Sequence, residues 1–288
     1  MDVIASYSDE KLRSLVPQLD SRANKYTRGK LVVLAGCARY PGAACLAAYA
    51  AQRSGAGYVQ VICDPQAVPV VQSYRPSLVV SSWEALAPSD LPVSKPGKPA
   101  ACIIGPGFDG EDVACRELAL KALRLTQAPA LVDGGALSAL ATGEGRLIAR
   151  NRAEAGLPTV LTPHGGEAAR LAKAARIEAD SEPELAALLA KAYGAVVVLK
   201  GPDTYVADGE KLVAITCGTP ALAKAGTGDV LAGMVGALMA QGVDSFDAAV
   251  LGAELHARAG LACESRMPAL CVTPEDLIEA IPAAVGAL

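Results

Sequence analysis

The stretch Val196-Val197-Val198-Leu199, followed directly by Lys200-Gly201, indicates the fold more clearly than any other part of the sequence. Consecutive apolar, mostly β-branched residues predict a strand that is covered on both faces, because a half-exposed strand would alternate apolar with polar residues. Leu31-Val32-Val33-Leu34 has the same character. Strands buried on both faces are typical of parallel sheets flanked by helices, so these two runs predict an α/β protein.

The rest of the chain alternates short apolar runs with alanine-rich stretches, which is the pattern of successive strand–helix–strand units. The expected strands are Leu31–Ala35, Tyr58–Cys63, Ala101–Ile104, Ala130–Asp133, Thr159–Leu161, Val196–Lys200, Thr204–Ala207 and Lys211–Ile215. The expected helices are Ala43–Ser54, Glu111–Arg124, Gly228–Gln241, Phe246–Cys263 and one that follows Thr273. We therefore expect a central, mostly parallel sheet with helices on both faces, a hairpin that turns at Asp208-Gly209, and an exposed loop over Pro88–Pro99.

The composition narrows the class of protein. We expect one domain over residues 1–288, since no internal repeat or long linker interrupts the chain. A net charge of -4 and only 4% aromatic residues argue against a nucleic-acid partner or an anionic membrane surface. The N-terminus has no signal-peptide pattern, and no apolar run approaches the roughly 20 residues of a membrane span. These features predict a soluble, cytoplasmic protein.

The eight cysteines are scattered and form no CxxC pair. Most lie inside apolar runs, so we expect buried, reduced thiols that act as small hydrophobic residues. Cysteine and histidine clusters with zinc-ligand spacing are also absent from the sequence, so we expect no metal site made by these residues.

The turn Gly226-Thr227-Gly228-Asp229 is the strongest candidate for chemistry. Small residues let a backbone approach a ligand closely, and the helix that follows offers unpaired N–H groups that bind phosphate. Asp229 stands in the first helical turn, where a carboxylate can accept a proton from a bound hydroxyl. Taken alone, the same segment is also compatible with a glycine-rich bend in which Asp229 is an ordinary cap.

Two further loops follow expected strands, where doubly wound sheets collect their ligands. Lys200-Gly201-Pro202-Asp203-Thr204 offers a cation and a hydroxyl to a phosphate, although it is also an acceptable surface turn. Thr162-Pro163-His164-Gly165-Gly166-Glu167 places a histidine beside glycines, which favours ligand contact over a simple helix cap. The other histidine, His256, lies in the middle of an expected helix, where a structural role is favoured.

Two more glycine-rich loops require caution. Gly105–Gly110 satisfies GxGxxG between a strand and a helix, but it lies in mid-chain and has Pro106 in the tight turn, so we disfavour a dinucleotide-binding interpretation. Gly36–Ala44 joins the first strand to a helix with a small, open N-terminus. The sequence has no GxxxxGK[ST] segment, so any phosphate must be held by helix termini and backbone rather than by a P-loop.

In this order the loops resemble those of the stand-alone bacterial ADP-dependent NAD(P)H-hydrate dehydratases, a repair family with a ribokinase-like fold. The segments that carry the resemblance are Lys30–Ala51 with Tyr40-Pro41-Gly42-Ala43-Ala44, Ile104–Gly107, Thr162–Glu167, Leu199–Gly201 and Ala225–Gly233. They extend over nearly the whole chain from about residue 25, so residues 1–24 are expected to be an N-terminal extension. The family's epimerase domain, which would precede Lys25, is not expected in this chain.

The resemblance implies roles for individual residues. Asp229, Gly226, Thr227 and Gly228 would form the catalytic turn. The hydrated nicotinamide nucleotide would contact Ala43, Gly107, His164 and Asp229. The adenine nucleotide would contact Lys200, Gly201, Pro202, Asp203, Thr204 and Gly228.

The same resemblance implies a reaction, its cofactor and its partners. ADP, or ATP in its place, would phosphorylate the hydroxyl of the S-epimer of hydrated NADH or NADPH, and loss of phosphate would restore the reduced nucleotide. Mg²⁺ would bridge the diphosphate oxygens, as phosphoryl transfers usually require. A homo-oligomer, with a tetramer suspected, and a separate epimerase as metabolic partner are also implied.

This sequence departs from the family pattern at two places. After the strand that ends at Asp133, the family often has a second acidic residue two positions later, where this chain has Gly135. A metal-associated role at that position is therefore in doubt. Thr219-Pro220 and Ala225-Gly226 also replace the family's usual Asn-Pro and Gly-Gly.

Three alternatives remain compatible with the sequence. A small-molecule kinase of the same fold, acting on a hydroxymethylpyrimidine, a thiazole alcohol or a sugar, would share the Gly226–Asp229 turn. An NAD-dependent oxidoreductase would depend on Gly105–Gly110, and a non-catalytic nucleotide sensor would bind ADP without turnover.

Overall fold

The computed structural model describes residues 4–288 and is built on one ten-stranded sheet, with the spatial order β1-β10-β9-β8-β7-β6-β5-β2-β3-β4. The strands are β1 (Ile4–Ala5), β2 (Lys30–Leu34), β3 (Tyr58–Cys63), β4 (Val79–Ser82), β5 (Ala100–Ile104), β6 (Ala130–Val132), β7 (Thr159–Leu161), β8 (Val196–Leu199), β9 (Thr204–Ala207) and β10 (Leu212–Ile215). Neighbouring strands are parallel except that β9 runs antiparallel to both β8 and β10. The mostly parallel sheet predicted from the sequence is confirmed.

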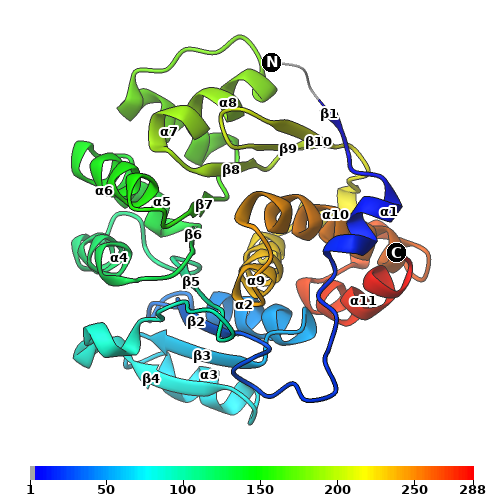
Figure 1. The fold of residues 1–288 in the computed structure, drawn as a ribbon, viewed down its shortest axis with the longest axis horizontal. Helices are drawn as coiled ribbons and strands as arrows, with labels where there is room; N and C mark the ends of the chain where they lie inside the picture. Colours follow the sequence, from blue (N-terminus) through cyan, green and yellow to red (C-terminus); the bar gives the residue numbers. More distant parts are fainter. Residues whose placement is uncertain (1–3) are drawn as a thin grey trace.

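Helices cover both faces of this sheet (Figure 1). They are α1 (Asp9–Leu15), α2 (Pro41–Arg53), α3 (Val68–Tyr74), α4 (Val113–Leu125), α5 (Gly135–Leu140), α6 (Gly143–Glu154), α7 (Gly165–Ala175), α8 (Glu182–Tyr193), α9 (Thr227–Ala240), α10 (Ser245–Glu264) and α11 (Pro274–Gly286). Short 3₁₀ turns are η1 (Trp83–Ala85), η2 (Pro88–Asp90), η3 (Pro220–Leu222) and η4 (Ala269–Cys271).

The two faces of the sheet have separate hydrophobic cores. Leu31 and Val33 of β2 join the core that includes α2, α9, α10 and α11, whereas Val32 and Leu34 join the core formed with α4 to α8. This division follows from the alternation of side chains along a strand, which sends successive residues to opposite faces. Because both sets are apolar, both faces must be covered, and the continuous apolar runs reflect that requirement.

Helix α9 lies inside the molecule between α2, α10 and the sheet (Figure 1). From Val230 to Ala240 every residue of α9 is buried, which is why its sequence is apolar all round rather than amphipathic. A helix enclosed in this way has a fixed position, so its N-terminus at Gly226–Asp229 is held rigidly against the neighbouring strand ends.

Most predicted elements are confirmed with small shifts of their ends, but the loop prediction over Pro88–Pro99 is partly wrong. Leu91 and Pro92 are buried, and Val93 forms a parallel bridge with Gln127. The segment is anchored because Leu91 fills the core beneath α4, while its prolines and polar residues keep it from forming a regular strand.

The segment expected to be an N-terminal extension packs on the rest of the fold through a short strand and a helix. Strand β1 pairs with β10, and Leu12 of α1 is fully buried against the main core. Residues 1–3 lie outside the described residues. Ser6 Oγ donates a hydrogen bond of 2.7 Å to Glu254 of α10, which ties this segment to the helical layer.

Two expectations from composition can also be compared with the structure. All eight cysteines are free thiols, and all are buried except the partly exposed Cys217 and the exposed Cys271, so the prediction of mainly buried thiols is confirmed. Within residues 4–288, none of the helices is both long enough and apolar enough to cross a membrane.

Candidate active site

The predicted loops meet at the carboxyl ends of β6, β7 and β8, which are adjacent in the sheet. Lys200 N–H donates to the carbonyl of Pro163 at 2.9 Å, and His164 and Lys200 form a parallel bridge. The loops after β7 and β8 are therefore joined through their backbones. This arrangement brings together two segments that the sequence separates by more than thirty residues.

The turn before α9 is shaped to leave donors free. Gly226 has φ of 98°, a conformation that glycine adopts without strain, and no side chain caps the helix. Within residues 4–288, the N–H groups of Gly228 and Asp229 have no hydrogen-bond partner. Such unpaired donors at a helix N-terminus form an anion-binding site.

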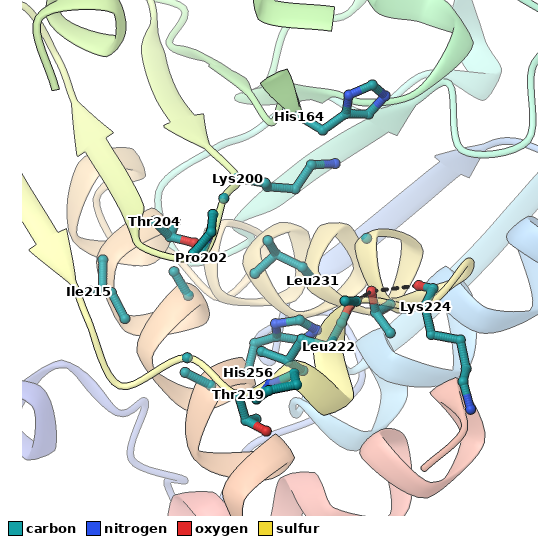
Figure 2. A pocket seen from close by; sticks show the side chains of 18 of the residues that line it. His164, Lys200, Pro202, Thr204, Ile215, Thr219, Leu222, Lys224, Leu231 and His256 are labelled. Atoms are coloured by element: carbon teal, nitrogen blue, oxygen red, sulfur yellow. Dashed lines mark hydrogen bonds between the residues drawn. The ribbon is translucent and has the colours of Figure 1, made fainter. Parts of the chain in front are cut away.

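Thr227 is placed differently from its neighbours in this turn. Its hydroxyl donates toward the carbonyls of Leu222 and Lys224, at 2.7 and 2.9 Å, and its N–H bonds to Lys224 as well. These bonds, which Figure 2 shows beside Leu222 and Lys224, fix the turn. Thr227 therefore contributes shape, while Gly228 and Asp229 contribute the free donors.

A cavity of about 710 Å³ opens beside the turn, which is within the usual size range for nucleotide-like ligands. Figure 2 shows His164 and Lys200 on one side of the cavity and His256, Leu222 and Thr219 on the opposite side. Its lining residues are His164, Lys200, Gly201, Pro202, Thr204, Ile215, Gly218, Thr219, Pro220, Leu222, Ala223, Lys224, Ala225, Gly226, Thr227, Gly228, Leu231, Ala253, His256 and Ala257.

The cavity has one polar and one apolar part. Lys200, the free N–H groups and Lys224 lie toward the α9 turn, whereas Ile215 and Leu222 contribute apolar walls. A ligand with a flat apolar base and an anionic tail fits this distribution. Of the six residues predicted to contact the adenine nucleotide, only Asp203 does not line the cavity.

Of the four residues predicted to contact the hydrated nicotinamide, only His164 lines the cavity. Gly107 packs against the first turn of α2, where a Cβ on it would be 2.8 Å from Ala43 Cβ and 2.5 Å from the carbonyl of Tyr40. One turn further along α2, Leu46 lies against Gly226. Ala43 and Gly107 are thus neighbours and approach the α9 turn from the α2 side.

His164 has two structural roles and an exposed ring. It is the N-cap of α7, where its Nδ1 accepts from Gly166 N–H at 3.0 Å and its own N–H donates to Glu167 at 2.9 Å. The ring is 61% exposed and lines the large cavity. It also lines a second, smaller cavity that holds Glu167 and Arg170. His164 therefore caps α7 and still exposes its ring to the cavity.

A group of charges that the sequence did not single out surrounds Lys200. Asp133 lies directly after β6 and is buried, and its Oδ1 accepts from Lys200 Nζ at 2.9 Å and from Thr162 Oγ1 at 2.6 Å. Glu167, in the first turn of α7, is also close enough to influence Lys200 and Asp229 electrostatically. Asp133 ends a predicted strand, and Glu167 lies at the end of a predicted loop. An acidic residue at the carboxyl end of a strand, or in the first turn of the helix after it, is the sequence signal that could have identified both.

These charges shift the acid strengths at the site. Burial, followed by the negative charge of Asp133, raises the pKa of Asp229 to about 7, while Lys200 acts in the opposite direction. Burial likewise raises the pKa of Glu167. Burial alone would lower the pKa of Lys200, but its acidic neighbours, Asp133 first, raise it instead. Asp229 is thus poised to exchange a proton near neutral pH.

His256 lies in the wall of the cavity, with only 7% of its surface exposed. Burial lowers its pKa to about 4, so the ring is neutral at physiological pH. Its Nε2 is buried and has no hydrogen-bond partner within the described residues. Burial in α10 agrees with the structural role predicted from its mid-helix position.

The Gly105–Gly110 loop serves a structural purpose. The N–H groups of Gly36 and Cys37 donate to the carbonyls of Pro106 and Gly107, which holds the loops after β2 and β5 together. Helix α4 begins only at Val113, so the glycines do not form a helix N-terminus for a pyrophosphate. This geometry agrees with the sequence analysis, which disfavours a dinucleotide-binding role for the loop.

The acids around Lys200 do not form a metal site by themselves. Across residues 4–288, no three His, Cys, Asp or Glu side chains are grouped so that they can hold a metal ion. Asp133 already accepts from Lys200 and Thr162. The residues present therefore do not fit a magnesium ion held by protein side chains alone.

The ten-stranded, mostly parallel sheet, the helix-terminal anion site and the buried carboxylate define a ribokinase-like α/β protein. A family model described as NAD(P)H-hydrate dehydratase matches residues 31–283. The chain belongs to this family. The match covers most of the chain and includes every loop described above.

Known relatives agree with this assignment. The ADP-dependent (S)-NAD(P)H-hydrate dehydratase of Xanthomonas campestris is 30% identical over 267 residues, which cover 90% of this chain and 89% of the relative. The bifunctional NAD(P)H-hydrate repair enzyme Nnr of Moorella thermoacetica is 34% identical over 285 residues, 94% of this chain and 52% of the relative. The chain spans about half the length of such bifunctional relatives.

A solved structure supports the fold assignment. The ADP/ATP-dependent NAD(P)H-hydrate dehydratase from Bacillus subtilis, co-crystallised with ATP/Mg²⁺, superposes with a TM-score of 0.80. Its sequence is 26% identical, and the match covers 99% of this chain and 98% of that chain. The ribokinase-like fold and the family predicted from the loops are confirmed.

Proposed function

We propose that this protein dehydrates the S-epimer of hydrated NADH and NADPH and restores the reduced nucleotide at the expense of ADP, which becomes AMP and phosphate. One observation carries the proposal: Lys200 and Gly228, whose N–H is free, line one cavity, and Asp229, whose pKa is raised to about 7, directly follows Gly228 in the first turn of α9. The Xanthomonas relative, whose name specifies ADP, supports the choice of donor.

In the first step the hydroxyl oxygen of the hydrate attacks the terminal phosphorus of ADP. The bond between that phosphorus and AMP breaks, and Asp229 accepts the proton of the hydroxyl. General-base assistance of this kind contributes about 10²–10⁴ in rate. The charge that develops on the transferred group is stabilised by the N–H groups of Gly228 and Asp229 and by Lys200.

In the second step the new phosphate ester is eliminated. The C–O bond breaks with help from the lone pair of the ring nitrogen, and the neighbouring carbon loses a proton. The products are the reduced nucleotide and inorganic phosphate. Phosphorylation is useful because hydroxide is a poor leaving group, whereas phosphate leaves readily.

We place the nucleotide base between the apolar walls near Ile215 and Leu222, and the diphosphate at the α9 turn. Lys200, Gly201, Pro202 and Thr204 would line its path. The hydrated ring would approach from the side of Ala43 and Gly107, with its hydroxyl toward Asp229. His164, exposed between the two cavities, would contact the nicotinamide nucleotide.

Mg²⁺ is proposed as a cofactor that arrives on the diphosphate, where it would bridge phosphate oxygens and neutralise their charge. The Bacillus subtilis structure, co-crystallised with ATP/Mg²⁺, supports its use in the family.

The remaining expectations are also proposals. Residues 1–288 would act as one catalytic unit in the cytoplasm and assemble as a homotetramer. An epimerase, as metabolic partner, would supply the S-epimer. Light scattering on the purified protein tests the tetramer directly, and a monomeric mass at working concentration would overturn it.

The central experiment supplies purified S-epimer of hydrated NADPH, Mg²⁺ and either ADP or ATP. We expect recovery of reduced-nicotinamide absorbance with one AMP and one free phosphate released for each NADPH when ADP is the donor. A product that keeps its phosphate ester would instead identify a kinase. Nucleotide binding without any turnover would identify a sensor, and the R-epimer serves as a negative control.

A further inference from the structure

Asp133 is a buried carboxylate that two side chains from neighbouring loops hold by hydrogen bonds. Only 4% of its side chain is exposed, and its Oδ1 accepts from Lys200 Nζ at 2.9 Å and from Thr162 Oγ1 at 2.6 Å. Because Lys200 and Thr162 cover it, Asp133 does not reach a ligand in the cavity. Any influence that it has on the reaction must pass through these neighbours.

The lysine that Asp133 holds lies directly over the catalytic turn. Lys200 is 20% exposed, and its Nζ is 3.2 Å from the position that a Cβ on Gly228 would occupy. The ammonium is thus beside the free N–H groups of Gly228 and Asp229. A lysine on a flexible four-carbon stem keeps one position only when a partner fixes it, and the structure gives it one charged hydrogen-bond partner, Asp133.

We propose that Asp133 is a positioning residue for the reaction: its carboxylate holds the Lys200 ammonium over the first turn of α9, where the transferred phosphoryl group would pass. The proposal rests on the proposed function, because it assigns Lys200 to that phosphoryl group. The ammonium provides the positive charge that a buried carboxylate needs.

The same contact sets the electrostatic surroundings of Asp229. The charged or titratable groups around it are Asp133 after β6, Lys200 after β8, Glu167 and His164 at the start of α7, and the neutral His256 of α10. Asp133 and Glu167 raise the pKa of Asp229, and Lys200 lowers it. Removing the charge of Asp133 should therefore lower the pKa of Asp229.

The test begins with Asp133→Asn, which keeps an oxygen acceptor in place and removes the charge. We expect kcat to fall about 10–100-fold, because a misplaced catalytic group costs on the order of 10²-fold. The dissociation constant for ADP should change less than about threefold, and the acidic limb of the pH profile of kcat/KM should move to lower pH by about one unit. A purely structural role would leave that limb in place.

A double-mutant cycle with Lys200→Met decides whether Asp133 acts through the lysine. In the Lys200→Met background, Asp133→Asn should change kcat less than about threefold, because the interaction is already gone. The double variant replaces a buried ion pair with two neutral groups, so it should fold even if one single variant does not. If the loss of kcat in the double variant equalled the product of the losses in the two single variants, the proposal would be overturned.

Two controls and one independent measurement complete the test. Thr162→Val removes the other donor to Asp133 and keeps both charges, so the acidic limb should stay in place. Asp133→Glu should restore part of the lost kcat. NMR titration of the Lys200 ammonium in wild type and Asp133→Asn needs no turnover. A lower pKa of Lys200 in the variant supports the ion pair with Asp133 even if the dehydratase assay fails, and an unchanged pKa overturns it.

Discussion

At the residue scale, Asp229 determines how the reaction depends on pH. A base must be deprotonated to accept the hydroxyl proton, and its pKa is raised to about 7. We therefore expect kcat/KM to rise about tenfold per unit of pH below neutrality and to level off above it. Asp229→Asn should abolish turnover while ADP still binds, as measured by calorimetry. An active Asn variant would contradict the assignment.

The same carboxylate should make the folded protein less stable at high pH. Because its pKa is higher in the folded state than the ordinary value of 3.8, the native state binds more protons than the unfolded state between these values. Stability from this group is therefore lost as pH rises toward 7. Asp229→Asn should raise the free energy of unfolding by about 1–3 kcal/mol at about pH 8, and by much less at about pH 4.

Urea unfolding at the two pH values measures this difference. The exposed Asp180 provides the matched control, because Asp180→Asn should change stability little at either pH. A stability gain for Asp229→Asn that is equal at both pH values would show that shape, rather than charge, is responsible.

Some residues of the candidate site could be predicted from the sequence and others could not. Asp229, Lys200 and His164 stand in short loops rich in glycine or proline, so their types and positions were conspicuous. Glu167 belongs to the same loop as His164, and Asp133 ends an expected strand, yet the importance of both acids depends on their being near Lys200. That convergence arises from the order β6-β7-β8 in the sheet, which no local pattern encodes.

At the scale of elements, the geometry of Gly226 controls the N-terminus of α9. With φ of 98°, an alanine there would be strained, and its Cβ would be 2.8 Å from both Leu46 Cδ1 and Pro274 Cγ. We expect Gly226→Ala to lower the free energy of unfolding by about 1–3 kcal/mol and kcat by on the order of 10²-fold. Calorimetric unfolding and the coupled assay measure the two effects.

Gly143→Ala is the matched control for this prediction. Gly143 begins α6, has no neighbour within 4 Å of an added Cβ and lies away from the cavity. Alanine there should leave activity unchanged and stability within about 0.5 kcal/mol of the wild type. If Gly226→Ala changed activity and stability as little as this control, the α9 turn would not require the left-handed backbone conformation of Gly226.

Strands and helices were predictable from the sequence where their apolar residues form a continuous run. The buried strands β2 and β8 and the helix α9 have sequences that burial on all sides requires, and α10 is buried along most of its length. Helices α6 and α8 were not predicted, since each buries only a few residues against the sheet and carries a weak apolar stripe. Strand β1 depends on pairing with β10, which lies about two hundred residues further along the chain.

At the scale of the whole molecule, the cavity connects parts of the fold that are far apart in sequence. Its walls come from the loops after β7 and β8, from the hairpin strands β9 and β10, and from α9 and α10. A nucleotide bound there contacts the sheet and the helical layer together. Because both layers share one sheet, we expect ligand binding to raise the stability of the whole chain rather than of a local segment.

ADP at about 100 times its dissociation constant should add roughly 2.7 kcal/mol to the free energy of unfolding. For a chain of this size the midpoint of thermal unfolding should rise by roughly 5 °C. GDP is the control, because it keeps the diphosphate and changes the base. An equal rise with GDP would show that only the phosphates are recognised. A rise confined to one of two separate transitions would show that the cavity does not join the two layers.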